Sequence, residues 1–267
     1  MLQTTTFPSG KTDYYFNESF EKINDIAQGK TIVIVTDKQL LSYYREKFEP
    51  YKVIVIPAGE ASKSWDMVRQ IAEGFINYEV DKSHIVVAVG GGVITDIAGF
   101  AAATYMRGLE VGFVPTSLLA MVDAAIGGKN GVNIGVYKNM MGTIRQSKFI
   151  LYDTQFLKTL PDEEWSNGFA EIIKYGCIFD RSLLEELSSH DLDFYKSNSD
   201  ALQYLIQRSV SYKTNVVQED EQEKGLRKLL NFGHTVGHAI ENNYGMVHGK
   251  AIAIGMILAS ELSHAMG

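Results

Sequence analysis

The sequence predicts an α/β domain built on a parallel sheet, followed by an all-helical domain. In the first half, short β-branched runs alternate with helical periodicity, whereas almost every pattern in the second half is helical. The change falls near residues 151–161. We therefore expect one domain over residues 1–155 and another over residues 156–267.

The first half contains short apolar runs that are typical of buried strands, each next to a turn signal. These predicted strands are residues 31–35, 53–56, 85–89 and 111–114. Two helices are predicted between them, at residues 64–78 and 93–106. In the first helix the spacing predicts one buried face that carries Trp65, Val68, Ile71, Ala72 and Phe75. Alternation of strands and helices favours a parallel sheet covered by helices.

The second half has apolar residues at helical spacing over most of its length. Four helices are predicted there, at residues 163–175, 201–217, 229–242 and 250–265. A ligand is expected in a cleft between the two domains, where such sites often lie.

Composition excludes several classes of protein. The net charge of −7 argues against a nucleic-acid surface, although a local basic site for a small anion is compatible with it. No apolar run is long enough to cross a bilayer, and residues 1–10 do not resemble a secretory signal. The single cysteine, Cys177, allows no intrachain disulfide. We therefore expect a cytoplasmic protein.

A glycine-rich loop, Gly90-Gly91-Gly92, follows the predicted strand 85–89 and opens a helix that carries Asp96. Glycines let the backbone approach a ligand, and a helix N-terminus attracts anions, so the loop favours a pyrophosphate and a Rossmann-like domain. The alternative is a plain tight turn, and the spacing is not the usual dinucleotide fingerprint. Asp37, at the end of the first strand, fits either a ribose acceptor or a helix N-cap.

Three of the six histidines lie close together, as His234, His238 and His248. The first two are one helical turn apart and share a face. Glu171, among apolar residues of a predicted helix, is the candidate carboxylate ligand, because an unpaired buried charge is costly. Two histidines, one carboxylate and an open position are typical of catalytic zinc. The pattern alone leaves open which two histidines bind, and a lone histidine there would be a satisfied core residue.

Several basic residues lie near glycines, asparagines or the candidate ligands. Such a set could surround a phosphate and a carboxylate, although each taken alone is equally typical of a solvated surface. The residues are Arg107, Lys129, Lys138, Lys174, Lys213 and Arg227.

An ordered series of motifs resembles the 3-dehydroquinate synthases of the sugar phosphate cyclase superfamily. The motifs run from about Thr31 to the last residue, and their order is that of the family. They include GEASK at residues 59–63, GGGVITD at 90–96, PTSLLAMVD at 115–123, GGKNGVN at 127–133, AEIIK at 170–174 and LNFGHTVGHA at 230–239. Two departures are Ala124-Ala125, where the family often has two serines, and Ser147, where it usually has proline.

The resemblance implies a residue for each role. Ligands of a divalent metal, Zn²⁺ or Co²⁺, would be Glu171, His234 and His248. Residues around NAD would be Asp37, Glu60, Lys63, Gly91, Gly92, Val93, Asp96, Thr116, Ser117, Asp123, Lys129 and Lys138. Catalytic and substrate residues would be Arg107, Asp123, Lys129, Asn139, Lys174, Lys213, Arg227, Asn231 and His238.

The implied reaction is a carbon–oxygen lyase step of the shikimate pathway, which makes aromatic amino acids. Transient oxidation by NAD, phosphate elimination, re-reduction and an intramolecular aldol would convert 3-deoxy-arabino-heptulosonate 7-phosphate to 3-dehydroquinate. Rivals are a sedoheptulose 7-phosphate cyclase, a metal-dependent alcohol or glycerol-phosphate dehydrogenase, and an inactive remnant. The inactive remnant is an alternative because members of the family continue past the helix predicted at residues 250–265. We therefore expect a C-terminally truncated helical domain. Family members are typically homodimers, and we expect no nucleic-acid or membrane partner.

Overall fold

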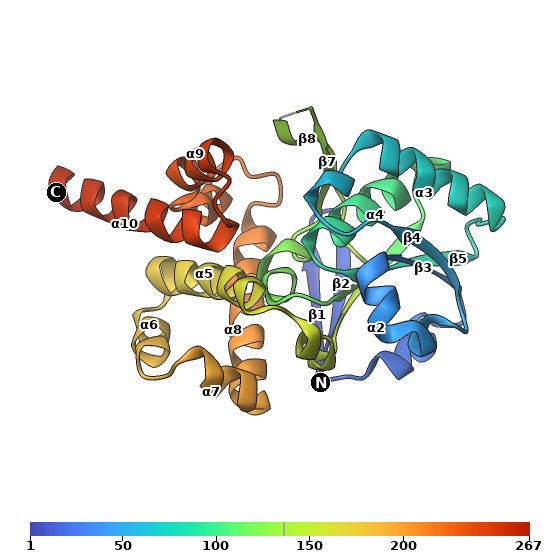
Figure 1. Ribbon diagram of the computed structural model, residues 1–267, viewed down its shortest axis with the longest axis horizontal. Helices are drawn as coiled ribbons and strands as arrows, with labels where there is room; N and C mark the ends of the chain where they lie inside the picture. The colour runs from blue at the N-terminus through green and yellow to red at the C-terminus, as the bar shows by residue number, and fades with distance from the viewer. Residues whose placement is uncertain (136) are drawn as a thin grey trace. The chain divides into compact units, whose positions relative to one another are not determined.

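A computed structural model describes residues 1–135 and 137–267, and the chain forms two compact units. Met1–Thr159, the α/β unit, contains a large sheet, and Leu160–Gly267, the helical unit, contains only helices among its regular elements (Figure 1). This confirms the predicted fold class.

The α/β unit is built on a seven-stranded sheet in the order β1-β2-β9-β6-β5-β3-β4. Its strands are β1 (Leu2–Phe7), β2 (Gly10–Phe16), β3 (Thr31–Asp37), β4 (Lys52–Ile56), β5 (His84–Gly90), β6 (Glu110–Pro115) and β9 (Phe149–Tyr152). Only the edge pair β1–β2 is antiparallel within this sheet. All four predicted strands are confirmed. Sequence analysis missed β1, β2 and β9, since the first two carry many polar residues and the third has only four residues.

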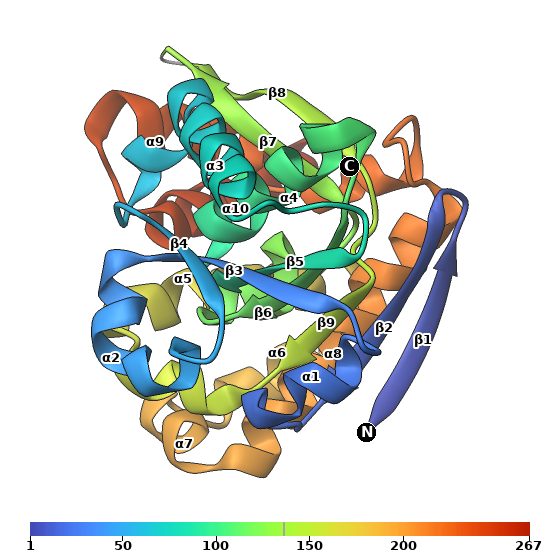
Figure 2. The same cartoon turned by 90° about the vertical axis from the view of Figure 1, so that its right-hand side faces the viewer.

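Helices cover both faces of this sheet (Figure 2). α1 (Ile23–Ile26) and α2 (Lys38–Phe48) lie on one face, where Ile34, Val87 and Phe149 belong to a continuous apolar core. α3 (Trp65–Asn77) and α4 (Gly92–Thr104) lie on the other. The predicted buried face of α3 is wrong at Trp65, which is 50% exposed, because it begins the helix and packs against Phe100 with only part of its ring.

A two-stranded hairpin, β7 (Lys129–Ile134) and β8 (Tyr137–Ile144), packs beside α4. The contact depends on a glycine, since a Cβ at Gly99 would lie 2.0 Å from Asn130 Oδ1. Asn130 is buried, and its amide donates to the carbonyl oxygens of Gly128 and Arg145. This packing fixes the hairpin against the helix that follows the glycine loop.

The helical unit has six helices among the described residues, and three of the four predicted helices are confirmed. They are α5 (Asp162–Phe179), α6 (Arg181–Ser188), α7 (Leu192–Ser197), α8 (Ser199–Glu219), α9 (His234–Tyr244) and α10 (His248–Met266). The prediction of one helix over residues 229–242 is wrong at its start. A 3₁₀ turn, Leu226–Asn231, ends before Gly233, whose φ of +77° breaks the helical path, and α9 begins at the next residue. No helix in the described part of the chain is long and apolar enough to cross a membrane.

Glycines let α9 and α10 approach each other closely. A Cβ at Gly255 would lie 2.0 Å from the carbonyl oxygen of Gly233, and one at Gly237 would lie 3.1 Å from that of Ala251. The start of α10 is tied to α5, because the backbone N–H of Gly249 donates to the side-chain oxygen of Asn167 at 2.7 Å. The helices α5, α9 and α10 are thus closely packed against one another in this unit.

Substitution of Gly255 by alanine is expected to destabilise the helical unit. The added methyl meets backbone atoms that cannot rotate away, and such overpacking typically costs about 1–3 kcal/mol. Gly10→Ala is the matched control, since a Cβ there meets nothing within 4 Å. Thermal unfolding of both variants tests this. Equal melting temperatures would show that α10 can shift without cost.

A polar network in the helical unit is centred on Asp180. Its Oδ1 caps α6 by accepting the backbone N–H of Ser182 at 3.0 Å, and its Oδ2 meets Arg208 and the hydroxyl of Tyr212. Hydrogen bonds from Ser182, Tyr212 and Arg208 hold the pKa of the Asp180 carboxyl below its ordinary value of 3.8.

Asp180→Asn is expected to remove a stabilisation that depends on pH. Because the folded-state pKa is depressed, the carboxylate stabilises the fold above about pH 4 and loses this contribution as the pH falls toward the folded-state pKa. Asparagine still caps a helix, so the cap itself is preserved. The denaturant midpoints of the two proteins should therefore differ most at pH 6, and the difference should shrink as the pH is lowered below about 4. A difference that is independent of pH would contradict the assignment.

Candidate functional site

The topology of the α/β unit marks a ligand site at the carboxyl ends of β3 and β5. From β3 the chain runs outward to β4, whereas from β5 it runs the opposite way to β6. Crevices at such switch points are where open α/β sheets bind ligands. β3 ends at Asp37 and β5 ends at Gly90, the two positions that the sequence singled out.

The glycine loop is close-packed where it turns into α4. A Cβ at Gly90 would lie 2.4 Å from Ile94, and one at Gly92 would lie 3.1 Å from Ala124. Gly91 is the N-cap of α4 and, within the described residues, no side chain caps this helix. A buried helix N-terminus without a side-chain cap can bind an anion through its first N–H groups. These observations fit the pyrophosphate of a dinucleotide better than a plain turn.

Three predicted nucleotide residues and the predicted substrate residue Asn139 lie close to Asn133, a residue that sequence analysis did not select. Asn133 donates from its side chain to Glu60 Oε1 at 2.8 Å, and its backbone N–H donates to the carbonyl oxygen of Lys63 at 2.9 Å. The ammonium of Lys63, 6% exposed, pairs with the carboxylate of Asp96 in α4. Asn139 donates its backbone N–H to Asn133 Oδ1 at 2.9 Å.

The remaining nucleotide candidates lie on the loops that flank β3 and β6. Asp37 Oδ1 accepts the backbone N–H of Leu40 at 2.8 Å, so the predicted N-cap is present, while burial raises the pKa of this carboxyl. Thr116 and Ser117 are buried, and the N–H of Thr116 donates to the carbonyl oxygen of Gly90. The loop after β6 is therefore fastened to the glycine loop.

Three predicted cations of the α/β unit are exposed, unlike Lys63. Arg107 follows α4 with φ of +60°, and Lys129 and Lys138 lie on the hairpin. Asp123 is half-buried in a π-helical turn, Ala120–Ala124. Arg107, Lys129 and Lys138 therefore lie at the solvent-exposed surface of this unit.

The helical unit brings together the predicted metal ligands. Glu171 comes from α5, His234 from the first turn of α9 and His248 from the first residue of α10. Glu171 Oε1 lies 3.4 Å from Nε2 of His234 and 3.4 Å from Nε2 of His248. Ligand atoms of a tetrahedral zinc, at bond lengths near 2.0–2.1 Å, are separated by about 3.3 Å. Both carboxylate–imidazole distances therefore match the spacing around a zinc or cobalt ion, and all three ligand atoms lie within 4.8 Å of one another.

The Nδ1 atom of each histidine, which points away from Glu171, lies near the oxygen of a carbonyl or carboxylate group. Nδ1 of His234 lies 3.1 Å from the carbonyl oxygen of Phe232, and Nδ1 of His248 lies 3.6 Å from Glu241 Oε2. Metal-binding histidines usually have such a partner, which leaves the other nitrogen for the cation. The sequence pattern left open which two of the three histidines bind a metal; in the structure His234 and His248 are the two that lie beside Glu171, as the resemblance implies.

Glu171 is fully buried and paired with the ammonium of Lys174, one turn along α5. Burial alone would raise the pKa of its carboxyl, but Lys174 and hydrogen bonds from His234 and His248 hold that pKa well below its ordinary value. For the imidazole of His248, burial alone would lower the pKa. Hydrogen bonds and charge from Glu171 and Glu241 outweigh this effect of burial and raise the pKa of His248 to about 9. A carboxylate thus stays charged in the interior, as a metal ligand must.

Other predicted substrate residues also lie in the helical unit. Lys213 in α8 is 7% exposed and Arg227 is 1% exposed, so the solvated alternative is wrong for both, as it is for Lys174. Arg227 donates from its guanidinium to the carbonyl oxygen of Glu221 at 2.7 Å. His238 is exposed, one turn after His234, with 5.2 Å between the ring centres.

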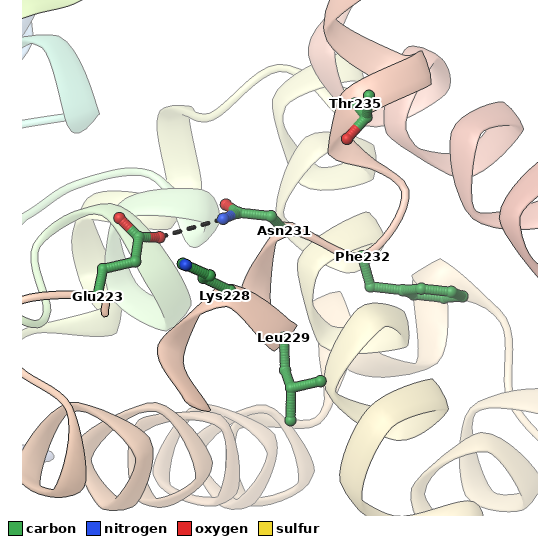
Figure 3. Close-up of a pocket in the computed structure, with 6 residues that line it drawn as sticks. All are labelled: Glu223, Lys228, Leu229, Asn231, Phe232 and Thr235. Carbon is green, nitrogen blue, oxygen red and sulfur yellow. Dashed lines mark hydrogen bonds between the residues drawn. The ribbon is translucent and has the colours of Figure 1, made fainter. Parts of the chain in front are cut away.

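A hollow of about 580 Å³ lies beside the start of α9 (Figure 3). Its floor includes Asn231, whose amide donates to Glu223 Oε1 at 3.1 Å. The lining residues are Glu223, Lys228, Leu229, Asn231, Phe232 and Thr235. Sequence analysis missed Glu223 and Glu241. Glu241, three residues after His238 on the same helix, could have been found from its spacing.

Both halves of the chain match the same family of known proteins. Residues 53–167 match the family model described as 3-dehydroquinate synthase N-terminal, and residues 168–267 match that described as 3-dehydroquinate synthase C-terminal. A 3-dehydroquinate synthase from Rippkaea orientalis is 44% identical over 248 residues, which cover 88% of this chain and 68% of that protein.

Two solved structures extend the comparison. A 2-deoxy-scyllo-inosose synthase complexed with carbaglucose-6-phosphate, NAD⁺ and Co²⁺ has a TM-score of 0.85 at 26% identity and covers 100% of this chain and 78% of that one. A 2-epi-5-epi-valiolone synthase from Streptomyces hygroscopicus, with NAD⁺ and Zn²⁺ bound, has a TM-score of 0.84 at 31% identity, covering 92% and 72%. The metal cluster, the glycine loop and the matches over both halves agree, and this chain belongs to the 3-dehydroquinate synthase family.

Proposed function

We propose that this chain is a carbon–oxygen lyase that converts 3-deoxy-arabino-heptulosonate 7-phosphate to 3-dehydroquinate and inorganic phosphate. The observation that carries the proposal is the cluster of Glu171, His234 and His248, at metal-ligand spacing, in a chain whose halves both match the family. This reaction is a step of the shikimate pathway, and its cofactors are NAD and a divalent cation.

Each cofactor has its own residues. The glycine loop, with Lys63 and Asp96, would hold the nucleotide, and Glu171, His234 and His248 would hold Zn²⁺ or Co²⁺. When bound, NAD supplies reversible hydride acceptance and the cation supplies Lewis-acid polarisation of substrate oxygens. Three protein ligands leave a coordination position for the substrate, as in catalytic zinc sites.

Side chains of the helical unit would bind and orient the anionic substrate. Lys174, Lys213 and Arg227 are buried cations, and such side chains suit phosphate and carboxylate groups. They would hold the phosphate and carboxylate, while Asn231 would hydrogen-bond a hydroxyl. His238, exposed and one turn from His234, would exchange a proton with the substrate or a water molecule.

A substrate with a carboxylate is preferred over a neutral sugar phosphate. Lys138, Asn139 and Lys213 add cationic and amide groups beyond those that a phosphate alone requires. Sequence identity also favours this choice, being 44% to a 3-dehydroquinate synthase and 31% to a valiolone synthase. Mass spectrometry of the product would separate the two substrates.

The chain, supplied with Zn²⁺, the heptulosonate phosphate and a trace of NAD, is expected to release phosphate over many turnovers without accumulating NADH. This follows because the hydride that NAD accepts is returned within each cycle. Phosphate assay and absorbance at 340 nm measure both quantities. Stoichiometric NADH would indicate a dehydrogenase instead, and absence of phosphate release would indicate an inactive remnant.

Substitution of Glu171 by glutamine is expected to weaken zinc binding by more than the about 10–100-fold that loss of an outer-shell partner costs. The amide keeps the shape but removes the charge that draws the cation inward. Glu163→Gln, at an exposed position on the same helix, is the matched control. Competition with a chromophoric chelator measures the affinity, and NAD binding should be unchanged. Equal zinc affinity of the two variants would remove Glu171 from the ligand set.

A further inference from the structure

A second group of ligand-type side chains lies on the outer side of the metal cluster. His238 and Glu241 are three residues apart on α9, and His248 begins α10. One ligand atom from each of the three lies within 4.8 Å of the others. We call this group, His238, Glu241 and His248, the outer set, and Glu171, His234 and His248 the inner set.

His248 belongs to both sets through different nitrogens. Its Nε2 lies 3.4 Å from Glu171 Oε1, and its Nδ1 lies 3.6 Å from Glu241 Oε2. The second distance is that of a long ion-pair contact, and it is close to the separation of two ligand atoms bound to one cation. The ring centres of His238 and His248 are 6.3 Å apart at 40°, which leaves room for an ion between the rings.

The outer set differs from the inner set in burial. Glu171 is fully buried, whereas His238 is exposed and Glu241 and His248 are half-buried. Each set contains one carboxylate, but that of the outer set is half-buried, so no fully buried charge requires a cation there. Cations therefore reach the outer set easily, and they bind it more weakly than the inner set.

We propose that His238, Glu241 and His248 form a second, weaker site for a borderline divalent cation such as Zn²⁺ or Co²⁺. Imidazole and carboxylate are the donors that suit these ions. With the inner cation on Nε2 of His248, a cation bound at Nδ1 would displace the ring proton to solvent, so that the imidazole bridges both ions while His238 is immobilised. Excess zinc would consequently inhibit the enzyme, a consequence that rests on the proposed function, whereas the site itself does not.

The test counts bound zinc by equilibrium dialysis. The wild-type chain is expected to bind one equivalent tightly and a second at higher zinc concentration. Glu241→Gln and His238→Asn should each lose the second equivalent and keep the first. Glu261→Gln, an exposed position on α10, is the matched control and should bind both equivalents.

Three results would overturn the proposal. The first is a wild-type chain that binds one equivalent only, and the second is a variant of the outer set that still binds two. The third is loss of the tight equivalent in Glu241→Gln, which would make Glu241 a support for His248. Circular dichroism confirms that the variants are folded. Because no turnover is measured, failure of the proposed reaction does not affect the result.

Discussion

The burial of one carboxylate governs the design of the helical unit. Glu171 has no exposed surface, and an ionised carboxylate in such a place is costly unless positive charge surrounds it. Lys174 supplies one cation from the same helix, and the imidazoles of His234 and His248 face the remaining oxygen. A divalent ion at the same point would match the charge more fully than these groups do alone.

Placing those imidazoles depends on how closely the backbones pack. Gly233, Gly237 and Gly255 remove the side chains that would hold α9 and α10 apart, and the bond from Gly249 to Asn167 fixes α10 against α5. A site of three ligands from three helices tolerates little displacement. The glycines next to the histidines therefore serve packing between helices, which determines the metal geometry indirectly.

The sequence predicted much of this arrangement, for reasons that differ between elements. Strands β3, β4, β5 and β6 were found because buried parallel strands are continuous apolar runs. A metal site was suspected because two histidines at helical spacing are rare in a core, whereas the choice of His234 and His248 came from the family resemblance. β1 and β2 were missed because their many polar residues obscure the alternation of apolar and polar positions that marks a strand. The break before α9 was missed because a single glycine in a helical pattern, here Gly233, is usually tolerated. Asn133 was missed because its role comes from contacts with other segments of the chain.

The separation of the inner ligands along the chain has a consequence for folding. Glu171 and His248 are 77 residues apart, and a cation bound to both would close that loop. Closing a long loop restricts the unfolded chain, as a disulfide does. In a polypeptide with one cysteine, the ion that serves chemistry would also act as the cross-link of the helical unit.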